Sequence, residues 1–227
     1  MKPTLVTTLC FLLFSFTTYF PLPFTHAGII VKDIYGKPVV PSGSYFIWPD
    51  YLVSGGELRL GVTENSTCPF TVLQDYSNYG HGFPVKFTPQ NQTSSDDPIT
   101  LGLHLDIAFD YKPVCAESTK WLVVEAENEY PTPWLAIDGT GKNVYDDGWF
   151  ELIAYERTGY LIYFCHKLSS TRGECRYISR KNDKNGMRLV FDDGDYLAAV
   201  FVNVDDIVRA RGSSIVKKDR AFTLPMI

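Results

Sequence analysis

Residues 31–39 of the chain read Val31-Lys32-Asp33-Ile34-Tyr35-Gly36-Lys37-Pro38-Val39, and Tyr45-Phe46-Ile47 follow after five more residues. The second part of this stretch lies in Ser44–Trp48, a run of mostly aromatic and β-branched residues directly after the turn formers Pro41-Ser42-Gly43. Such a run, bounded by turn residues, predicts a β-strand.

The same pattern of short strands and turns continues along the chain. Turn formers such as Ser54-Gly55-Gly56, Asp138-Gly139 and Asn185-Gly186 separate the runs. Regular spacing of this kind predicts one all-β domain, a barrel or a sandwich, with a weak threefold recurrence of its parts. The expected strands are Ser44–Trp48, Glu57–Val62, Phe70–Gln74, Leu101–Ile107, Trp121–Glu125, Trp149–Ala154, Tyr160–Phe164, Met187–Phe191 and Tyr196–Asn203.

The N-terminus predicts a cleaved signal peptide over residues 1–27. Lys2 supplies a positive charge, Leu9–Phe16 is an apolar run, and Thr25-His26-Ala27 places small residues where a signal peptidase cuts, before Gly28. The alternative is a membrane anchor, but the run is shorter than the roughly 20 residues that span a bilayer. We therefore expect a secreted protein, extracellular or vacuolar, with its domain over 28–204. The tail, residues 205–227, is expected to be a short helix or a flexible end.

Composition and cysteine usage restrict the function. The net charge of -5 does not favour nucleic acid or an anionic membrane as a partner. Cys10 lies in the leader. The expected secreted domain keeps four cysteines, which permit three disulfide connectivities: Cys68, Cys115, Cys165 and Cys175. No Cys-x-x-Cys occurs and the histidines lack ligand spacing, so we expect neither a metal nor another cofactor. Residues 136–143 depart from a phosphate-binding loop at Ala136 and Asn143.

The opening stretch resembles the N-terminal signature of the Kunitz soybean-trypsin-inhibitor family. Residues 68–72, 121–125 and 147–150 are similar to further segments of that family. The resemblance implies a β-trefoil, in which a six-stranded barrel is closed by a triangular cap of hairpins. It also implies the disulfides Cys68–Cys115 and Cys165–Cys175. The implied function is not catalytic: a monomer presents a rigid exposed loop to a serine or cysteine endopeptidase and loses little entropy on binding.

The sequence departs from trypsin inhibitors of this family at the expected reactive position, Asn91-Gln92-Thr93. Family inhibitors carry Arg or Lys there, which the carboxylate of a trypsin-like specificity pocket requires, and residues 88–98 contain no basic residue. A family asparagine that braces the loop is replaced by Pro41, which donates no hydrogen bond. Asn91 also lies in a glycosylation sequon, as does Asn65, and a glycan on Asn91 would obstruct docking. We therefore expect weak trypsin inhibition through this loop.

The segment from Cys165 to Cys175 is a second candidate loop, because a short disulfide would restrain it. Its basic and small residues, which a protease would contact, are Lys167, Ser170, Thr171, Arg172 and Gly173. The structural alternative is a solvated hairpin tip. The functional alternative to an inhibitor is a non-inhibitory trefoil: a carbohydrate-binding, miraculin-like, storage or defence protein.

Overall fold

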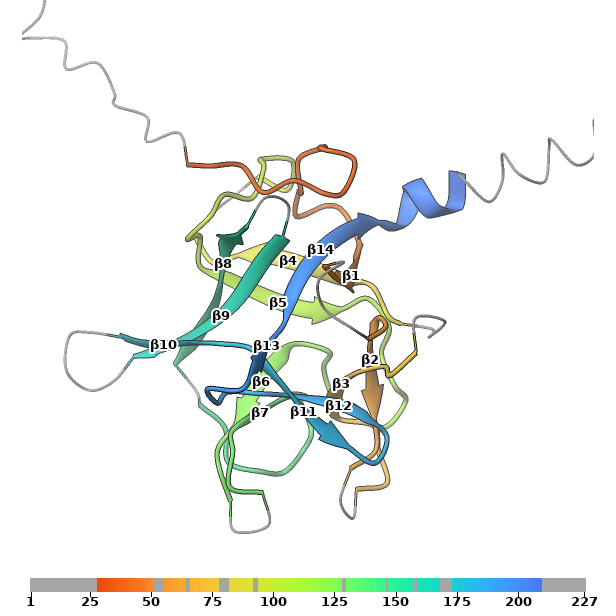
Figure 1. Ribbon diagram of the computed structural model, residues 1–227, viewed down its shortest axis with the longest axis vertical. Helices are drawn as coiled ribbons and strands as arrows, with labels where there is room; N and C mark the ends of the chain where they lie inside the picture. Colours follow the sequence, from red (N-terminus) through yellow and green to blue (C-terminus); the bar gives the residue numbers. More distant parts are fainter. Residues whose placement is uncertain are drawn as a thin grey trace, which may run out of the picture.

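A computed structural model describes residues 28–50, 55–63, 66–77, 82–91, 94–127, 130–145, 147–156, 159–167 and 173–209, without the side chains of Lys167 and Gly173. Except for a short helix over residues 204–209, its regular elements are strands (Figure 1). They are β1 (Tyr45–Pro49), β2 (Leu58–Gly61), β3 (Thr71–Gln74), β4 (Val85–Pro89), β5 (Leu105–Phe109), β6 (Trp121–Val124), β7 (Trp134–Ile137), β8 (Gly148–Tyr155), β9 (Gly159–Lys167), β10 (Gly173–Tyr177), β11 (Ser179–Asp183), β12 (Gly186–Val190), β13 (Asp195–Tyr196) and β14 (Ala198–Asn203).

Six of the strands form a closed barrel. The hydrogen-bonded order is β9-β14-β1-β4-β5-β8, and β8 pairs back onto β9 over eight residue pairs to close the ring. Because the ring is closed, each of these six strands is paired on both sides. Strand β10 extends the sheet beyond β9 and is its edge.

Three hairpins, β2–β3, β6–β7 and β11–β12, cap one end of the barrel. One strand of each hairpin pairs with the other two, since β3 pairs with β7, β7 with β12 and β12 with β3. The cap is therefore a triangle, and each third of the chain supplies barrel strands and one cap hairpin. The predicted all-β trefoil and its threefold recurrence are confirmed.

The core fills the barrel and the space under the cap. In β4, Val85, Phe87 and Pro89 are buried and alternate with exposed Lys86 and Thr88, as the period of two in a strand requires. Phe87 meets the ring of Phe201 edge-on at 5.1 Å. Burying each such aromatic side chain contributes about 1.5–3 kcal/mol.

The disulfides link Cys68 to Cys115, with 6.0 Å between the Cα atoms, and Cys165 to Cys175, with 4.0 Å between the Cα atoms. This is the pairing that the family resemblance implies. The first ties the connection between β2 and β3 to the segment before β6, and the second joins β9 to β10.

Most expected strands are present with ends shifted by one to three residues, and two expectations were wrong in part. The run Leu101–Ile107 forms a strand only from Leu105, because residues 101–104 belong to the loop before β5. The run Tyr196–Asn203 is divided at Leu197, where the chain passes from the cap to the barrel. Strands β4, β7, β10 and β11 were not predicted.

Candidate functional site

The loop between β4 and β5 leaves the barrel from a well-bonded base. The last ladder pair is Pro89 with Leu105, and beyond it the Gln90 N–H donates to the His104 carbonyl at 2.9 Å. The Gln90 side chain adds a bond to the Asp106 carboxylate at 3.0 Å. Beyond this base, Asn91 and residues 94–97 are exposed. The expected reactive position therefore begins on a protruding loop, although Gln92 and Thr93 themselves lie outside the described residues.

The returning half of this loop is anchored by Ile99, whose side chain is fully buried. Its N–H donates to the Val39 carbonyl, and its carbonyl accepts from the Val31 N–H, both at 2.8 Å. Residues 31–39, which we call the signature stretch, thus add a second set of backbone hydrogen bonds to the loop. Figure 1 shows the two segments, red and yellow-green, side by side at one end of the barrel.

Asp33 sets the shape of the signature stretch. Its buried carboxylate accepts from the Tyr35 and Lys37 N–H groups, each at 2.9 Å, and so closes a turn over these residues. Gly36 in this turn has φ of 77°, a conformation that favours glycine. The Ile34 N–H then donates to the Phe201 carbonyl at 3.0 Å, which fastens the turn to β14.

Ser42 braces the exposed part of the loop. Its N–H donates to the Ser95 carbonyl at 3.0 Å, and its hydroxyl donates to the Asp96 carboxylate at 3.3 Å. The expectation drawn from Pro41 was therefore incomplete, because the adjacent residue supplies donors that proline lacks. Sequence reasoning missed Ser42. The predicted turn Pro41-Ser42-Gly43 already contained a serine hydroxyl next to Pro41, and that hydroxyl could have been recognised as a donor.

The turn that carries Ser42 is itself held from beneath by Tyr45. The Val40 N–H donates to the Tyr45 hydroxyl at 3.0 Å, and that ring is buried. A Cβ on Gly43 would lie 2.5 Å from the same hydroxyl oxygen, so only glycine lets the turn pack this closely. Burial raises the pKa of Tyr45 above its ordinary value, which keeps the hydroxyl neutral.

The chemistry of the described loop is acidic and polar. Asp96 and Asp97 are exposed carboxylates close to the expected reactive position. They would repel the carboxylate of a trypsin-like specificity pocket, whereas a pocket without a charge imposes no such penalty. The described part of the loop therefore combines a hydrogen-bonded base with an acidic and polar surface.

The second candidate loop leaves the barrel from β9 and β10. Glu174 faces His166 and Gly173 faces Lys167 across the two strands, and the disulfide joins Cys165 to Cys175 at the base. The expected contact residues Ser170, Thr171 and Arg172 lie outside the described residues, as does the sequon residue Asn65. Figure 1 shows the β9–β10 hairpin far from the loop after β4, so the two candidate loops form separate sites.

Within the described residues, no group of three or more His, Cys, Asp or Glu side chains is placed to hold a metal ion. No helix in the same part of the chain is long and apolar enough to cross a membrane.

Comparison with known proteins gives one consistent result. A family model described as trypsin and protease inhibitor, of the legume Kunitz type, matches residues 31–203. The chain is 37% identical over 213 residues to the Kunitz-type trypsin inhibitor-like 2 protein of Pisum sativum, covering 90% of this chain and 95% of that protein. It is 35% identical over 199 residues to the subtilisin inhibitor CLSI-II of Canavalia lineata, covering 81% and 98% respectively.

A solved structure of a Kunitz type trypsin inhibitor from Cicer arietinum superposes with a TM-score of 0.69 at 36% identity, covering 78% of this chain and 99% of that one. Family model, relatives and solved structure agree over the part of the chain that forms the barrel and cap. The chain therefore belongs to the legume Kunitz family of trypsin and protease inhibitors.

Proposed function

We propose that this protein is a secreted inhibitor of a serine endopeptidase and that it acts without catalysis. The observation that carries the proposal is the double brace of the loop after β4. Ser42 bonds its exposed half and Ile99 anchors its return. A loop held in this way loses little conformational entropy on entering a protease cleft, so an interface of ordinary size binds tightly.

The acidic and polar surface of the loop sets the class of target. We propose a protease whose specificity pocket carries no carboxylate, as opposed to trypsin, because Asp96 and Asp97 follow closely after the expected contact position. A relative of this chain is named as a subtilisin inhibitor, which supports a target outside the trypsin class. A cysteine endopeptidase remains a target to be tested in the same panel.

The hairpin β9–β10 is the second loop that we propose for protease contact, with a trypsin-like enzyme as its target. Its disulfide restrains the strands before binding. Arg172 would enter the specificity pocket, with Lys167 as the reserve candidate. Removing a buried arginine anchor typically costs about 2 kcal/mol or more, which is at least tenfold in affinity.

The experiment is an inhibition panel with trypsin, chymotrypsin, subtilisin, elastase and papain. Ser42→Ala should weaken inhibition of the target by about fivefold, because it removes roughly 1 kcal/mol of hydrogen bonding to the loop. Ser118→Ala is the matched control, since among the described residues the Ser118 hydroxyl accepts a local N–H from Lys120 and bonds to neither loop. Arg172→Ala and Lys167→Ala test the hairpin, and Asn91→Gln tests a glycan.

Each result assigns a loop or removes the proposal. Loss of inhibition in Ser42→Ala with no change in Arg172→Ala assigns the loop after β4, and the reverse assigns the hairpin. If the parent protein inhibits none of the five enzymes at micromolar concentration, the non-inhibitory trefoil replaces the inhibitor as the function.

A further inference from the structure

Strand β10 is an edge whose bonding pattern can be read from its neighbours. The Ile178 N–H donates to the Ile162 carbonyl at 2.9 Å. In an antiparallel pair, bonded and non-bonded residue pairs alternate, so residues 174 and 176 also bond to β9 and residue 175 does not. The short Cα separation of Cys165 and Cys175, 4.0 Å, agrees with a non-bonded pair.

It follows that the N–H and C=O groups of Cys175 and Tyr177 point away from β9. No backbone hydrogen bond joins these groups to another strand within the part of the chain that the structure describes. An edge with unpaired backbone groups is a template for a further strand. The disulfide holds this edge in place before any partner arrives, which lowers the entropic cost of pairing.

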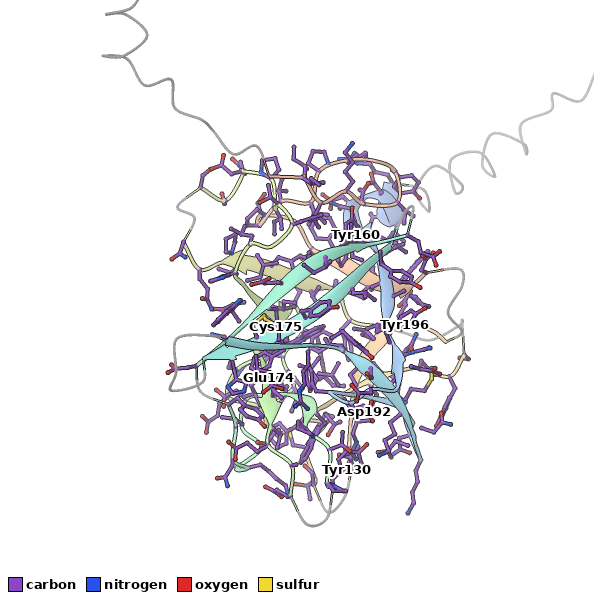
Figure 2. All side chains as sticks on the ribbon, turned by 60° about the vertical axis from the view of Figure 1, so that its left-hand side comes forward. Tyr130, Tyr160, Glu174, Cys175, Asp192 and Tyr196 are labelled. Carbon is purple, nitrogen blue, oxygen red and sulfur yellow. A yellow bond between two sulfur atoms is a disulfide. The ribbon has the colours of Figure 1, made fainter. Side chains whose placement is uncertain are left out.

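The edge forms one wall of an open groove. The groove has a volume of about 530 Å³, within the range of ligand-binding clefts, and it runs between β10, residues 131–133 and residues 191–193. The far wall is held together because the Phe191 N–H donates to the Pro133 carbonyl at 3.0 Å. Figure 2 labels Glu174 and Cys175 on β10 and Asp192 on the turn that closes this wall.

A small recess with aromatic and charged walls adjoins the groove. It has a volume of about 80 Å³, and its lining includes Tyr145, Phe164 and Phe191 together with His166, Glu174 and Arg176. The rings of Tyr145 and His166 lie 4.8 Å apart and form one side of it. Pro133 and Phe191 line both spaces, so a chain lying in the groove has the recess within reach of one of its side chains.

The charges along the groove are unbalanced toward the negative. The Arg176 guanidinium donates twice to one oxygen of Glu174, at 2.7 and 3.0 Å, so these two charges offset each other. The carboxylates of Asp192 and Asp193 on the opposite wall have no ion pair among the described residues. The groove therefore attracts a cationic side chain and repels an anionic one.

We propose that the free edge of β10 is a second docking site, which takes an extended basic segment of a partner protein. The segment pairs its backbone with Cys175 and Tyr177, places an apolar side chain in the recess and sets a lysine or arginine beside Asp192 and Asp193. Strand addition of this kind draws affinity from main-chain bonds and specificity from alternate side chains. The site is separate from the loop after β4, so the protein can hold this partner while that loop is occupied.

The test begins with a random library of octapeptides displayed on phage and selected against the full-length protein. The selected peptides should share a basic and an apolar residue at alternating spacing. Asp193→Lys should weaken the best synthetic peptide by about tenfold, since a charge attraction becomes a repulsion. Glu117→Lys changes another exposed carboxylate by the same charge outside the groove, and it should leave the affinity unchanged.

Methylation of the peptide backbone tests the strand itself. Because only alternate residues of an added strand bond to β10, N-methyl groups at alternate positions should each cost about tenfold, and those between them little. Equal losses at all positions, no enrichment of basic peptides, or equal weakening by Glu117→Lys would each overturn the proposal. Amide shifts at Cys175 and Tyr177 that depend on protein concentration alone would replace the basic partner with a second copy of this chain.

Discussion

Tyr45→Phe is the sharpest test of how the barrel supports the loop. The ring is buried and stays in place in the variant, while the hydroxyl that accepts the Val40 N–H at 3.0 Å is lost. Leaving that donor without a partner costs about 1–3 kcal/mol of unfolding free energy. For a domain of this size, a loss of about 2 kcal/mol lowers Tm by roughly 4–8 °C.

The measurement is urea unfolding and thermal melting of the parent and the variant, followed by inhibition of the target protease. Because the Val40 turn carries Ser42, inhibition should weaken several-fold as the turn loosens. Tyr35→Phe is the control: its side chain is 60% exposed, so the unfolding free energy should change by less than about 0.5 kcal/mol. A Tyr45→Phe variant as stable as the Tyr35→Phe control would refute the argument. If Tyr45→Phe lowers the unfolding free energy but leaves inhibition unchanged, the Val40 turn does not support the loop in its inhibitory conformation.

Four further predictions concern charge, covalent structure and processing. Gln92→Arg should create trypsin inhibition where the parent has little, which a trypsin assay measures; no gain would show that more than the missing cation separates this loop from trypsin inhibitors. Ionic hydrogen bonds from Lys86 and Ser44 hold the pKa of Asp110 below its usual value, so its stabilisation is present above about pH 4 and fades as pH falls toward the folded pKa. The difference in unfolding free energy between parent and Asp110→Asn should accordingly shrink in acid, and a pH-independent difference would contradict this. Replacing Cys165 and Cys175 together by alanine should cost about 3 kcal/mol, by the loop-closure estimate for a separation of 10 residues, and denaturant unfolding measures it. N-terminal sequencing of the secreted protein should begin at or within a few residues of Gly28, and a retained Met1 would contradict the signal peptide.

Much of the fold could be predicted from local sequence, and three of the four missed strands have a composition that hides them. In β10 and β11, charged residues such as Glu174, Arg176 and Lys181 interrupt the apolar pattern, because these strands lie at a sheet edge or in the cap with one face in solvent. Strand β7 has the opposite composition: all of its residues are buried, so no alternation marks it as a strand. These compositions weaken the signal in β7, β10 and β11, but β4 alternates regularly between buried and exposed residues, so its pattern was present in the sequence and was missed.

The site was harder to predict than the fold, because its function depends on contacts between segments distant in sequence. Counting along the chain placed Pro41 at the brace, and only the structure shows that Ser42, one residue later, reaches Ser95 and Asp96. A shift of one residue in a turn leaves the strands on either side unchanged, so no periodic signal reports it. The chemistry of the loop, by contrast, could be determined from the sequence, because the absence of a basic residue does not depend on the three-dimensional structure.

Both candidate loops are held by anchors that lie among the described residues. The loop after β4 is fixed by Ile99 and Ser42, and the β9–β10 hairpin by its disulfide. We expect substitutions at either tip to alter protease recognition at little cost to the barrel, because changes away from such anchors typically alter stability by only about 0.5 kcal/mol. The sequence has no basic residue over 88–98, and the chain nevertheless keeps the family's fold and its two disulfides.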